Sequence, residues 1–367
     1  MKRRIQAILL LVLILTGCAP EIETPALEDM GLVGIIGFDY LDGKQMKVTV
    51  SVPLPELKTT KKTQFFTTVS RLPSESLISL STKSDRTMQF SQLRVVLINE
   101  ELARKSGIHK IVRDLSRNPI VGDNVYIAVV KGTAEEIITS EYKSMPEINT
   151  YLNNLLRPRR ETSFGPFTTM HDFMYTSTNQ VCDPSLPYLE KTDGELQLTK
   201  VASFKGDKLI GFLSEREGIL VQAILGRNNL PKMPFEVEEE SNKKATVVVD
   251  FVRARSEVES FGDLSKPTIR IKISTEGPIL GYTGSRDLEN PREINEVRRQ
   301  IEQELIKEIH ALLQKFQKKG IDPAALEESL RTRYRGKWKR EMGLSALKKA
   351  TFQVSVDIDF TGYGTMK

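Results

Sequence analysis

The residue with the clearest chemistry in the sequence is Cys18, the last residue of a Leu-Thr-Gly-Cys box. A cationic start at residues 2–4 and an apolar run over residues 5–15 precede it, in the order of an export signal. The small Thr and Gly can lie extended in a peptidase cleft, and the Cys18 thiol can be alkylated by a diacylglycerol. Cleavage then exposes the α-amine for acylation. We therefore predict a lipoprotein with a signal peptide over residues 1–17 and an N-acyl, S-diacylglycerol Cys18.

Two other interpretations of this N-terminus are weaker. The apolar run is shorter than the ~20 residues that a membrane-spanning helix needs. An ordinary secretory signal could end in a cysteine by chance, but charge, apolar length, small residues and the cysteine position all agree with lipidation. Because two or more acyl chains anchor a protein stably, we expect Cys18 to hold the chain to the outer face of a lipid bilayer.

Length and charge narrow the class of protein. Removal of 17 of the 367 residues leaves 350, enough for two or three domains. The formal net charge of +5 falls to +2 once Lys2, Arg3 and Arg4 are removed, so nucleic acid is not an expected partner. With Cys18 used for lipid, Cys182 has no intramolecular partner, and we expect a buried or unreactive thiol.

Motifs for metal, nucleophile and phosphate chemistry are absent from the sequence. The histidines, His109, His171 and His310, lie far apart and have no neighbouring ligand at metal spacing. Their convergence in space remains open, but surface or core histidines are the simpler interpretation. We expect no catalytic residue, no metal site and no cofactor.

Two strands open the folded part of the chain. Residues 31–38 form an apolar run, and residues 46–52 alternate apolar and polar side chains, which predicts a hairpin. Gly31, Gly34 and Gly37 lie in the first run. They are strand glycines in our interpretation, because their spacing is wrong for a dinucleotide fingerprint and no helix follows.

The next part of the chain alternates helix and strand patterns. Such alternation is typical of an α/β unit. We expect an N-terminal α/β region over residues 18–228, with about 58–140 as an inserted α/β unit, and leave residues 151–189 unassigned. The expected elements are helices at 74–81, 99–113, 134–139 and 215–225, and strands at 93–98, 125–130, 196–204 and 209–212.

A polar stretch over residues 226–244 predicts a domain boundary. Residues 240–367 then form a C-terminal α+β domain, with strands expected at 246–252, 269–273 and 352–360. The fold class that we predict is α+β, a mixed α/β multi-domain chain. Its C-terminal, antiparallel-rich sheet is covered by a long helix.

The long helix has clear start and stop signals. Asn290 can cap it, Pro291 suits its first turn, and Glu293 stands where a capping box needs an acid. Gly320 can end it, and Asp322-Pro323 can start a second helix in the same way. A helix lying on a membrane would have a similar apolar stripe, but the flanking strands need a cover, so we favour core packing. The stripe consists of Ile294, Val297, Ile301, Leu305, Ile309, Leu312 and Phe316.

One basic cluster lies near the C-terminus, over residues 331–340, and is interleaved with Tyr334 and Trp338. On a lipid-anchored protein it could meet anionic headgroups. Alternatively, the two aromatic residues share one helical face and pack in the core while the charges are solvated. We favour the second interpretation. The basic residues are Arg331, Arg333, Arg335, Lys337, Lys339 and Arg340.

Several of these segments together resemble the Ger(x)C lipoproteins, the C subunits of spore germinant receptors. The order and spacing of these segments, together with the lipoprotein box that precedes them, are similar to those of that family. The chain differs from the usual pattern at Ala19-Pro20 and at residues 325–328, where relatives often have a glycine-containing stretch. The similar segments are residues 31–39, 42–43 and 47–52, the helix pair from 295 through 322–323 to 331–334 and 338, and residues 354–362.

The resemblance implies a non-enzymatic lipoprotein on the outer surface of the spore inner membrane. It implies that the chain acts with two partners, a membrane-embedded A subunit and a transporter-like B subunit. Together the subunits respond to nutrients. Asp322 and Trp338 look like family motif positions, and we expect Asp322 to cap a helix and Trp338 to anchor a core or interface.

Two other functions are weighed against this one. A solute-binding lipoprotein of a transporter predicts two similar α/β lobes around a cleft. An envelope hydrolase needs carboxylates that folding brings together in a cleft.

Overall fold

The computed structural model describes most of the chain after the predicted tether. The expected signal peptide, Cys18 and most of residues 19–28 lie outside the described residues. In the part that is described, no helix has the length and apolar character needed to cross a bilayer. The described residues are 26, 29–54, 62–143, 145–166, 168–179, 181–239 and 243–363.

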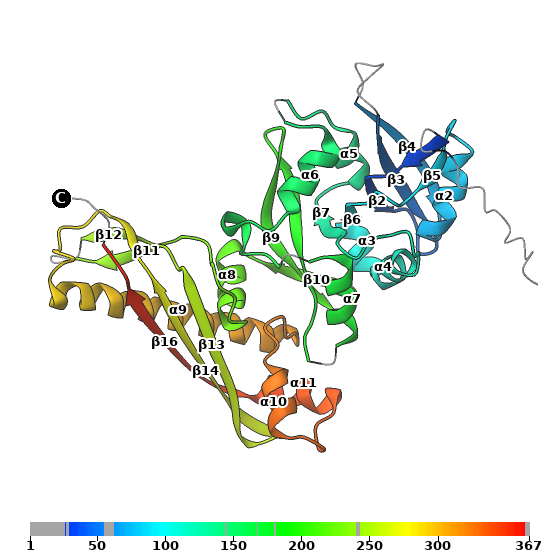
Figure 1. Cartoon of the computed structure of the whole chain (residues 1–367). Coiled ribbons are helices and arrows are strands. Elements are labelled where there is room, and N and C mark those ends of the chain that lie inside the picture. The colour runs from blue at the N-terminus through cyan, green and yellow to red at the C-terminus, as the bar shows by residue number, and fades with distance from the viewer. Residues whose placement is uncertain are drawn as a thin grey trace, which may run out of the picture.

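An eight-stranded mixed sheet forms the N-terminal half (Figure 1). Its central strands β2, β6, β7 and β8 are parallel, and antiparallel strands extend it on both sides. In spatial order the strands are β10 (Lys208–Leu213), β9 (Glu195–Lys205), β8 (Ser185–Thr192), β7 (Tyr126–Val130), β6 (Val95–Asn99), β2 (Ile35–Tyr40), β3 (Met46–Pro53) and β4 (Thr63–Ser70).

Helices cover both faces of this sheet, as buried parallel strands require. Neighbouring residues of β2 show the two faces, because Ile35 belongs to one apolar cluster and Ile36 to the other. The Ile35 face is covered by α5 (Ala134–Thr139) and α6 (Ile148–Leu156). The Ile36 face is covered by α2 (Pro73–Ser81), α3 (Glu100–Lys105), α4 (His109–Ser116) and α7 (Met170–Thr178).

The expected hairpin at the start of the fold is confirmed, since β2 and β3 pair antiparallel. The apolar run over residues 31–38 is not one strand, however. It is divided between β1 (Met30–Leu32), which pairs with β5 (Thr87–Gln89) in a separate small sheet, and β2. A side chain at Gly34 would collide with Asn149 of α6, because the Cβ would lie 2.3 Å from its Oδ1.

The helix expected over residues 99–113 is also divided. It is interrupted at Gly107, whose φ of +74° belongs to the left-handed region, so α3 and α4 are separate helices. Strands β4 and β5 were not expected. Residues 58–140 contribute β4, β6 and β7 to the same sheet as β2 and β3, and so do not form a sheet of their own.

Regular structure fills most of the segment that the sequence left unassigned. Residues 151–189 contain the end of α6, a short 3-10 helix η2 (Arg160–Thr162), α7 and the start of β8. The Thr169 hydroxyl and the Asp172 carboxylate form a capping box at the start of α7. This segment therefore supplies the start of β8, an inner strand of the large sheet, and a helix against that sheet.

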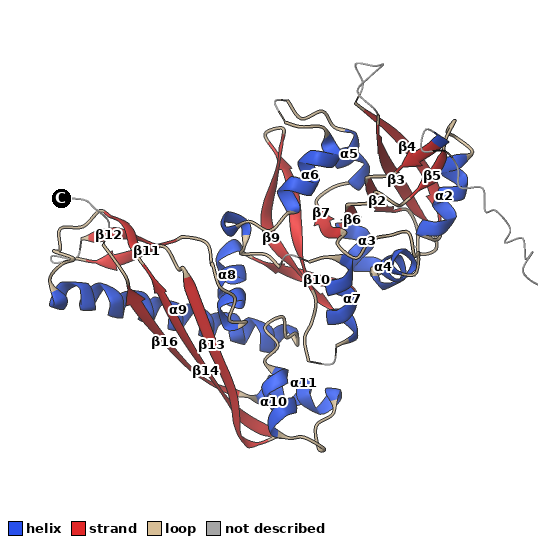
Figure 2. Cartoon of the chain, viewed as in Figure 1, coloured by secondary structure: helices blue, strands red, loops and turns tan. Residues whose placement is uncertain are grey.

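Two three-stranded sheets and one long helix form the C-terminal half (Figure 2). Three of its four strand pairs are antiparallel, so the expected antiparallel-rich sheet and the mixed α/β class are confirmed. One sheet contains β11 (Met233–Glu238), β12 (Lys244–Val249) and β15 (Ile279–Tyr282). The other contains β13 (Arg253–Asp263), β14 (Lys266–Gly277) and β16 (Thr351–Phe360).

Helix α9 (Pro291–Lys319) is the expected cover. The Asn290 side chain accepts a hydrogen bond from the Arg292 N–H, and Gly320 ends the helix with a φ of +65°. All seven residues of the apolar stripe are buried in the protein core, so core packing is confirmed over a membrane-lying helix. The expected capping box is wrong, because the Glu293 carboxylate accepts from the Asp287 N–H.

Helix α8 (Glu215–Ile224) connects the two halves. Its apolar residues lie in one cluster with Phe164 and Val201 of the N-terminal half and with the sheets and α9 of the C-terminal half. Arg216 of α8 also contacts Glu304 and Glu308 of α9. The helix that we expected to start at Asp322-Pro323 begins later, as α10 (Glu327–Arg333), and α11 (Arg340–Lys349) follows it.

Candidate functional site

Two loops from different halves of the chain meet beside α10. One contains Asp183 and leads into β8, and the other contains Asp322 and follows α9. The Asp183 N–H donates to the Asp322 carbonyl at 2.9 Å, and the Asp322 N–H donates to the Asp183 carboxylate at 2.9 Å. A pair of opposed hydrogen bonds therefore fixes the position of one loop on the other.

Three acidic side chains are buried at this junction. Asp183, Asp322 and Glu327 are 5%, 1% and 2% exposed. One cation contacts them, since Lys205 Nζ lies 3.0 Å from Asp183 Oδ2. The Asp322 carboxylate accepts the N–H of Glu327, the first residue of α10, at 2.7 Å. Asp322 Oδ1 and Glu327 Oε2 are buried and have no hydrogen-bond partner among the described residues.

Burial raises the pKa of two of these carboxyl groups into the neutral range. Burial raises the pKa of Asp322 to about 7, against the opposing effect of hydrogen bonds from the N–H groups of Glu327 and Leu326. Burial also raises the pKa of Glu327 to about 8, and the nearby charge of Asp322 adds to the effect. The junction therefore holds protons that it can release around neutral pH.

Trp338 extends the junction to α11. An added Cβ at Gly343 would lie 2.5 Å from Glu327 Oε2 and 2.7 Å from Trp338 Nε1, so both atoms converge over this glycine. The indole nitrogen is buried and has no hydrogen-bond partner among the described residues. The absence of a side chain at Gly343 thus leaves room for the Glu327 carboxyl group beside the indole ring.

The expected packing of Tyr334 and Trp338 is wrong. Helix α10 ends at Arg333, and Gly336 has a φ of +79°, so the two aromatic residues do not share a helical face. Both are half-buried, and the Tyr334 hydroxyl donates to the Gly262 carbonyl at the turn between β13 and β14. The basic residues around them are therefore divided: Arg331 and Arg333 lie in α10, Arg340 starts α11, and the others lie on the loop between these helices.

A cavity of about 560 Å³ adjoins the acidic junction. Its polar wall includes Asp172 of α7 together with Cys182 and Asp183, and its apolar wall includes Val201 and Val221. The volume falls within the range of small-molecule sites. Both carboxylates are engaged, Asp172 in the cap of α7 and Asp183 with Lys205 and Asp322.

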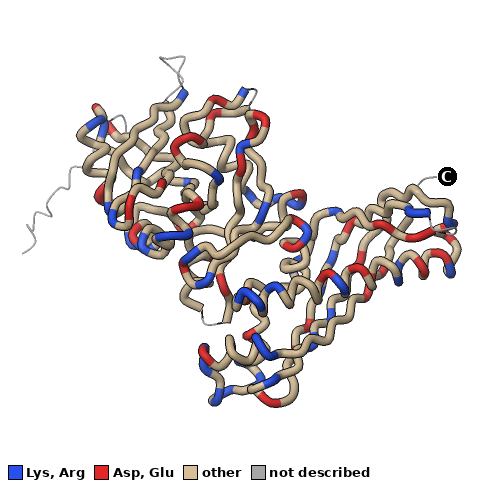
Figure 3. Tube along the Cα trace, turned by 180° about the vertical axis from the view of Figure 1, so that it is seen from behind, with Lys and Arg blue, Asp and Glu red and all other residues tan. Residues whose placement is uncertain are grey.

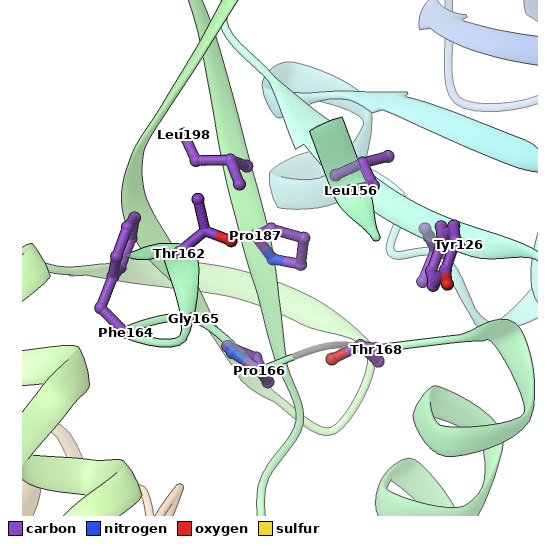
Figure 4. Close-up of a pocket in the computed structure, with 10 residues that line it drawn as sticks. Tyr126, Leu156, Thr162, Phe164, Gly165, Pro166, Thr168, Pro187 and Leu198 are labelled. Atoms are coloured by element: carbon purple, nitrogen blue, oxygen red, sulfur yellow. The ribbon is translucent and has the colours of Figure 1, made fainter. Parts of the chain in front are cut away.

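A smaller pocket shares part of this wall (Figure 4). Figure 4 shows Phe164, Pro166 and Thr168 on the connecting segment, with Pro187 and Leu198 on the strands beside it. Its volume of about 10 Å³ is near the minimum for one water molecule, so it is a packing defect beside the main cavity.

The cysteine and histidines have no catalytic arrangement in the described part of the chain. Burial raises the pKa of the Cys182 thiol, which agrees with the unreactive thiol expected from the sequence. His109 starts α4, His171 lies in α7 and His310 in α9. Among the described residues, no group of three or more His, Cys, Asp or Glu side chains could hold a metal ion.

Comparison with known proteins places both halves among spore germination proteins. The family model of the spore germination protein N-terminal domain matches residues 24–191. The model described as spore germination B3/GerAC like, C-terminal, matches residues 199–364. The boundary between the two models falls at the start of β9, so the second model includes most of β9 and all of β10 of the large sheet as well as α8 and the C-terminal half.

Two relatives extend the match over most of the chain. The spore germination protein GerQC of Bacillus cereus is 27% identical over 364 residues, which cover 99% of each chain. The spore germination protein KC of Bacillus subtilis strain 168 is 21% identical over 362 residues, covering 90% of this chain and 88% of that protein. The crystal structure of the GerBC protein has a TM-score of 0.60 at 16% identity, with 93% of this chain and 100% of that chain covered, and shows the same fold.

Proposed function

The chain belongs to the GerAC family of spore germination proteins, and from this membership we propose that it is the lipid-anchored C subunit of a nutrient germinant receptor. Its proposed role is assembly and signal coupling with the A and B membrane subunits of the receptor. The proposed location is the outer face of the spore inner membrane, where the acylated Cys18 would hold it.

One observation carries this proposal: the two family models together match nearly the whole chain after the predicted signal peptide. The full-length similarity to GerQC supports the same conclusion. The resemblance inferred from the sequence is confirmed at the level of the family. The nutrient, the lipid anchor and the contacts with other subunits belong to the proposal.

The junction suits a coupling role better than a catalytic one. Asp183 and Asp322 connect the halves through one backbone hydrogen bond and one hydrogen bond to the Asp183 carboxylate, so movement of one loop must displace the other. The two acids of the cavity wall are already engaged in a helix cap and an ion pair. Our proposal therefore includes no enzymatic activity.

A transporter solute-binding protein is not favoured by the architecture. That function predicts two similar α/β lobes. The N-terminal half has an eight-stranded sheet with helices on both faces, whereas the C-terminal half has two three-stranded sheets and α9. The cavity lies beside the junction of these unlike halves.

Complementation of spores that lack this gene tests the proposal. A Cys18→Ala copy should leave the nutrient response as weak as in the deletion strain, measured as the fall in optical density after addition of amino acids, sugars or nucleosides. The wild-type copy should restore the response. A normal nutrient response of the deletion strain, with every other receptor gene removed, would overturn the receptor assignment.

A matched control separates anchoring from folding. The Cys18→Ala chain is given an N-terminal membrane-spanning helix in place of residues 1–17, which restores membrane attachment without acylation. Recovery of the response identifies anchoring as the function of Cys18. A full response from the unanchored Cys18→Ala chain would contradict the lipoprotein part of the proposal.

A further inference from the structure

A surface hollow of about 530 Å³ lies at the loop between α10 and α11. Arg331, Thr332, Arg335 and Trp338 line it, together with Glu328 and Gly336. From this arrangement we infer that the hollow binds the phosphate of an anionic phospholipid headgroup. The inference rests on the proposed function, because it assumes that the chain works beside a membrane.

The charges of the hollow favour an anion. Residues 331–340 contain six basic residues and no acidic one. Glu328 pairs with Arg331 through both guanidinium donors, Nε and Nη2. Arg335 is exposed and forms no salt bridge within the described part of the chain. One positive charge of the hollow is therefore balanced and another is not.

Further basic side chains without a salt-bridge partner in the described part of the chain surround the hollow. Arg333, Lys337 and Lys339 are exposed, with no salt bridge among the described residues. The nearby acid Asp263, at the turn between β13 and β14, contributes one opposing charge close to Lys337. In Figure 3 the α10–α11 region lies at the lower end of the C-terminal half, away from the large sheet. This end of the molecule can thus approach a surface without obstruction by the N-terminal half.

The chemistry of the lining groups matches a phosphate diester. A guanidinium group presents its donors in a planar fork that fits two phosphate oxygens. The Thr332 hydroxyl adds one more polar group, although it lies 3.5 Å from the Glu328 carboxylate in this structure. Trp338 supplies part of the wall of the hollow through its ring, while its Nε1 is buried toward Gly343. The exposed Met342, at 42%, gives apolar surface nearby.

Vesicle sedimentation tests the inference on the full mature chain with Cys18→Ser, so that the anchor does not dominate binding. We expect at least about 25-fold stronger binding to vesicles of phosphatidylcholine with 30% phosphatidylglycerol than to phosphatidylcholine alone. Loss of one basic residue near a charged surface corresponds to about fivefold weaker binding. The double variant Arg331→Gln and Arg335→Gln should therefore bind about 25-fold more weakly.

The matched control removes two arginines elsewhere. Arg113 and Arg117 are exposed residues of the α4 segment in the N-terminal half, and the pair Arg113→Gln and Arg117→Gln should bind like the parent chain. Equal losses in both double variants would overturn the hollow as the site. Inorganic phosphate binding by titration calorimetry, without any preference for anionic vesicles, would overturn the lipid assignment in favour of a free phosphate. The vesicle test does not measure germination. Its failure would therefore leave the Cys18→Ala test of the proposed function unaffected.

Discussion

The Asp183 N–H donates to the Asp322 carbonyl and the Asp322 N–H donates to the Asp183 carboxylate, so two residues that are 139 positions apart hold each other by hydrogen bonds that run in opposite directions. Each loop would need little energy to move alone, because it has no regular secondary structure of its own. Joined, they place one acid from each half in the same buried volume, next to Glu327. A change in the protonation of these buried acids should therefore also change the contact between the two halves.

Stability should fall as pH rises through the neutral range. The folded-state pKa values of Asp322, about 7, and Glu327, about 8, exceed the ordinary values of 3.8 and 4.5. Between about pH 4 and 8 the folded chain therefore binds protons that the unfolded chain has released. The free energy of unfolding should decrease with pH in that window, by up to about 1.4 kcal/mol per pH unit for each group.

Glu327→Gln isolates one of the two groups. From pH 6 to pH 8 the variant should lose about 2 kcal/mol less than wild type, measured by urea unfolding in buffers of equal ionic strength. The emission of Trp338, the single tryptophan of the chain, should titrate in wild type and not in the variant. The neighbouring, only partly buried Glu328→Gln is the control, and a pH profile of Glu327→Gln that coincides with it would disprove a buried, protonated Glu327.

Replacement of Asp183 should weaken the connection between the halves. Asp183→Ala removes both the partner of Lys205 and the acceptor of the Asp322 N–H, and we expect a loss of about 3 kcal/mol in the free energy of unfolding at pH 7. Asp183→Asn keeps an acceptor oxygen and should cost about 1 kcal/mol. Urea unfolding measures both values. The exposed Asp123→Ala should change stability by less than about 0.5 kcal/mol. An equally small effect of Asp183→Ala would contradict a stabilising contact between the Asp183 and Asp322 loops.

The sequence predicted the elements whose periodicity is long and regular. Helix α9 and the strands β3 and β16 have unbroken apolar patterns, so their faces and approximate bounds were predicted correctly. The face of β14 was also predicted, but the strand extends beyond the expected residues 269–273 at both ends. Strand β4 was missed because its buried positions do not alternate cleanly along the sequence. In β13 they do alternate, but the inward positions include Ser256 and Ser260, so no regular apolar pattern marks the strand. Gly107 was missed as a break, because only its positive φ reveals that the helix ends there.

The candidate site was predicted only in fragments. Asp322 and Trp338 were selected by resemblance, but nothing in the spacing indicates that Asp183 lies against Asp322. Glu327 has the sequence context of an ordinary acid in the first turn of a helix, and only its burial distinguishes it. Such contacts depend on how two halves pack, which local patterns do not record.

Ala325 should be improved by a glycine. Its φ of +53° is in the left-handed region, which costs a residue with a Cβ about 1–2 kcal/mol. Ala325→Gly removes that cost but adds backbone freedom to the unfolded chain, so we expect a net gain of about 0.5–1 kcal/mol, seen as a higher Tm. The buried neighbour Ala324→Gly should instead lower the Tm. A lower Tm for Ala325→Gly would show that the positive φ carries no strain.

Gly343→Ala should be harmful although alanine is the better helix former. Within α11 the exchange alone would gain about 1 kcal/mol. The added methyl group would lie 2.5 Å from Glu327 Oε2 and 2.7 Å from Trp338 Nε1, and overpacking of this kind costs about 1–3 kcal/mol. Because the Glu327 carboxyl group is buried, α11 or the indole ring must move, and we expect a net loss of about 1 kcal/mol with a red shift of the Trp338 emission.

The control is Gly122→Ala, whose Cβ would meet nothing within 4 Å. Thermal unfolding followed by tryptophan fluorescence compares the two, and a Gly343→Ala chain that is more stable than wild type with unchanged emission would refute close packing of Glu327 and Trp338 over Gly343.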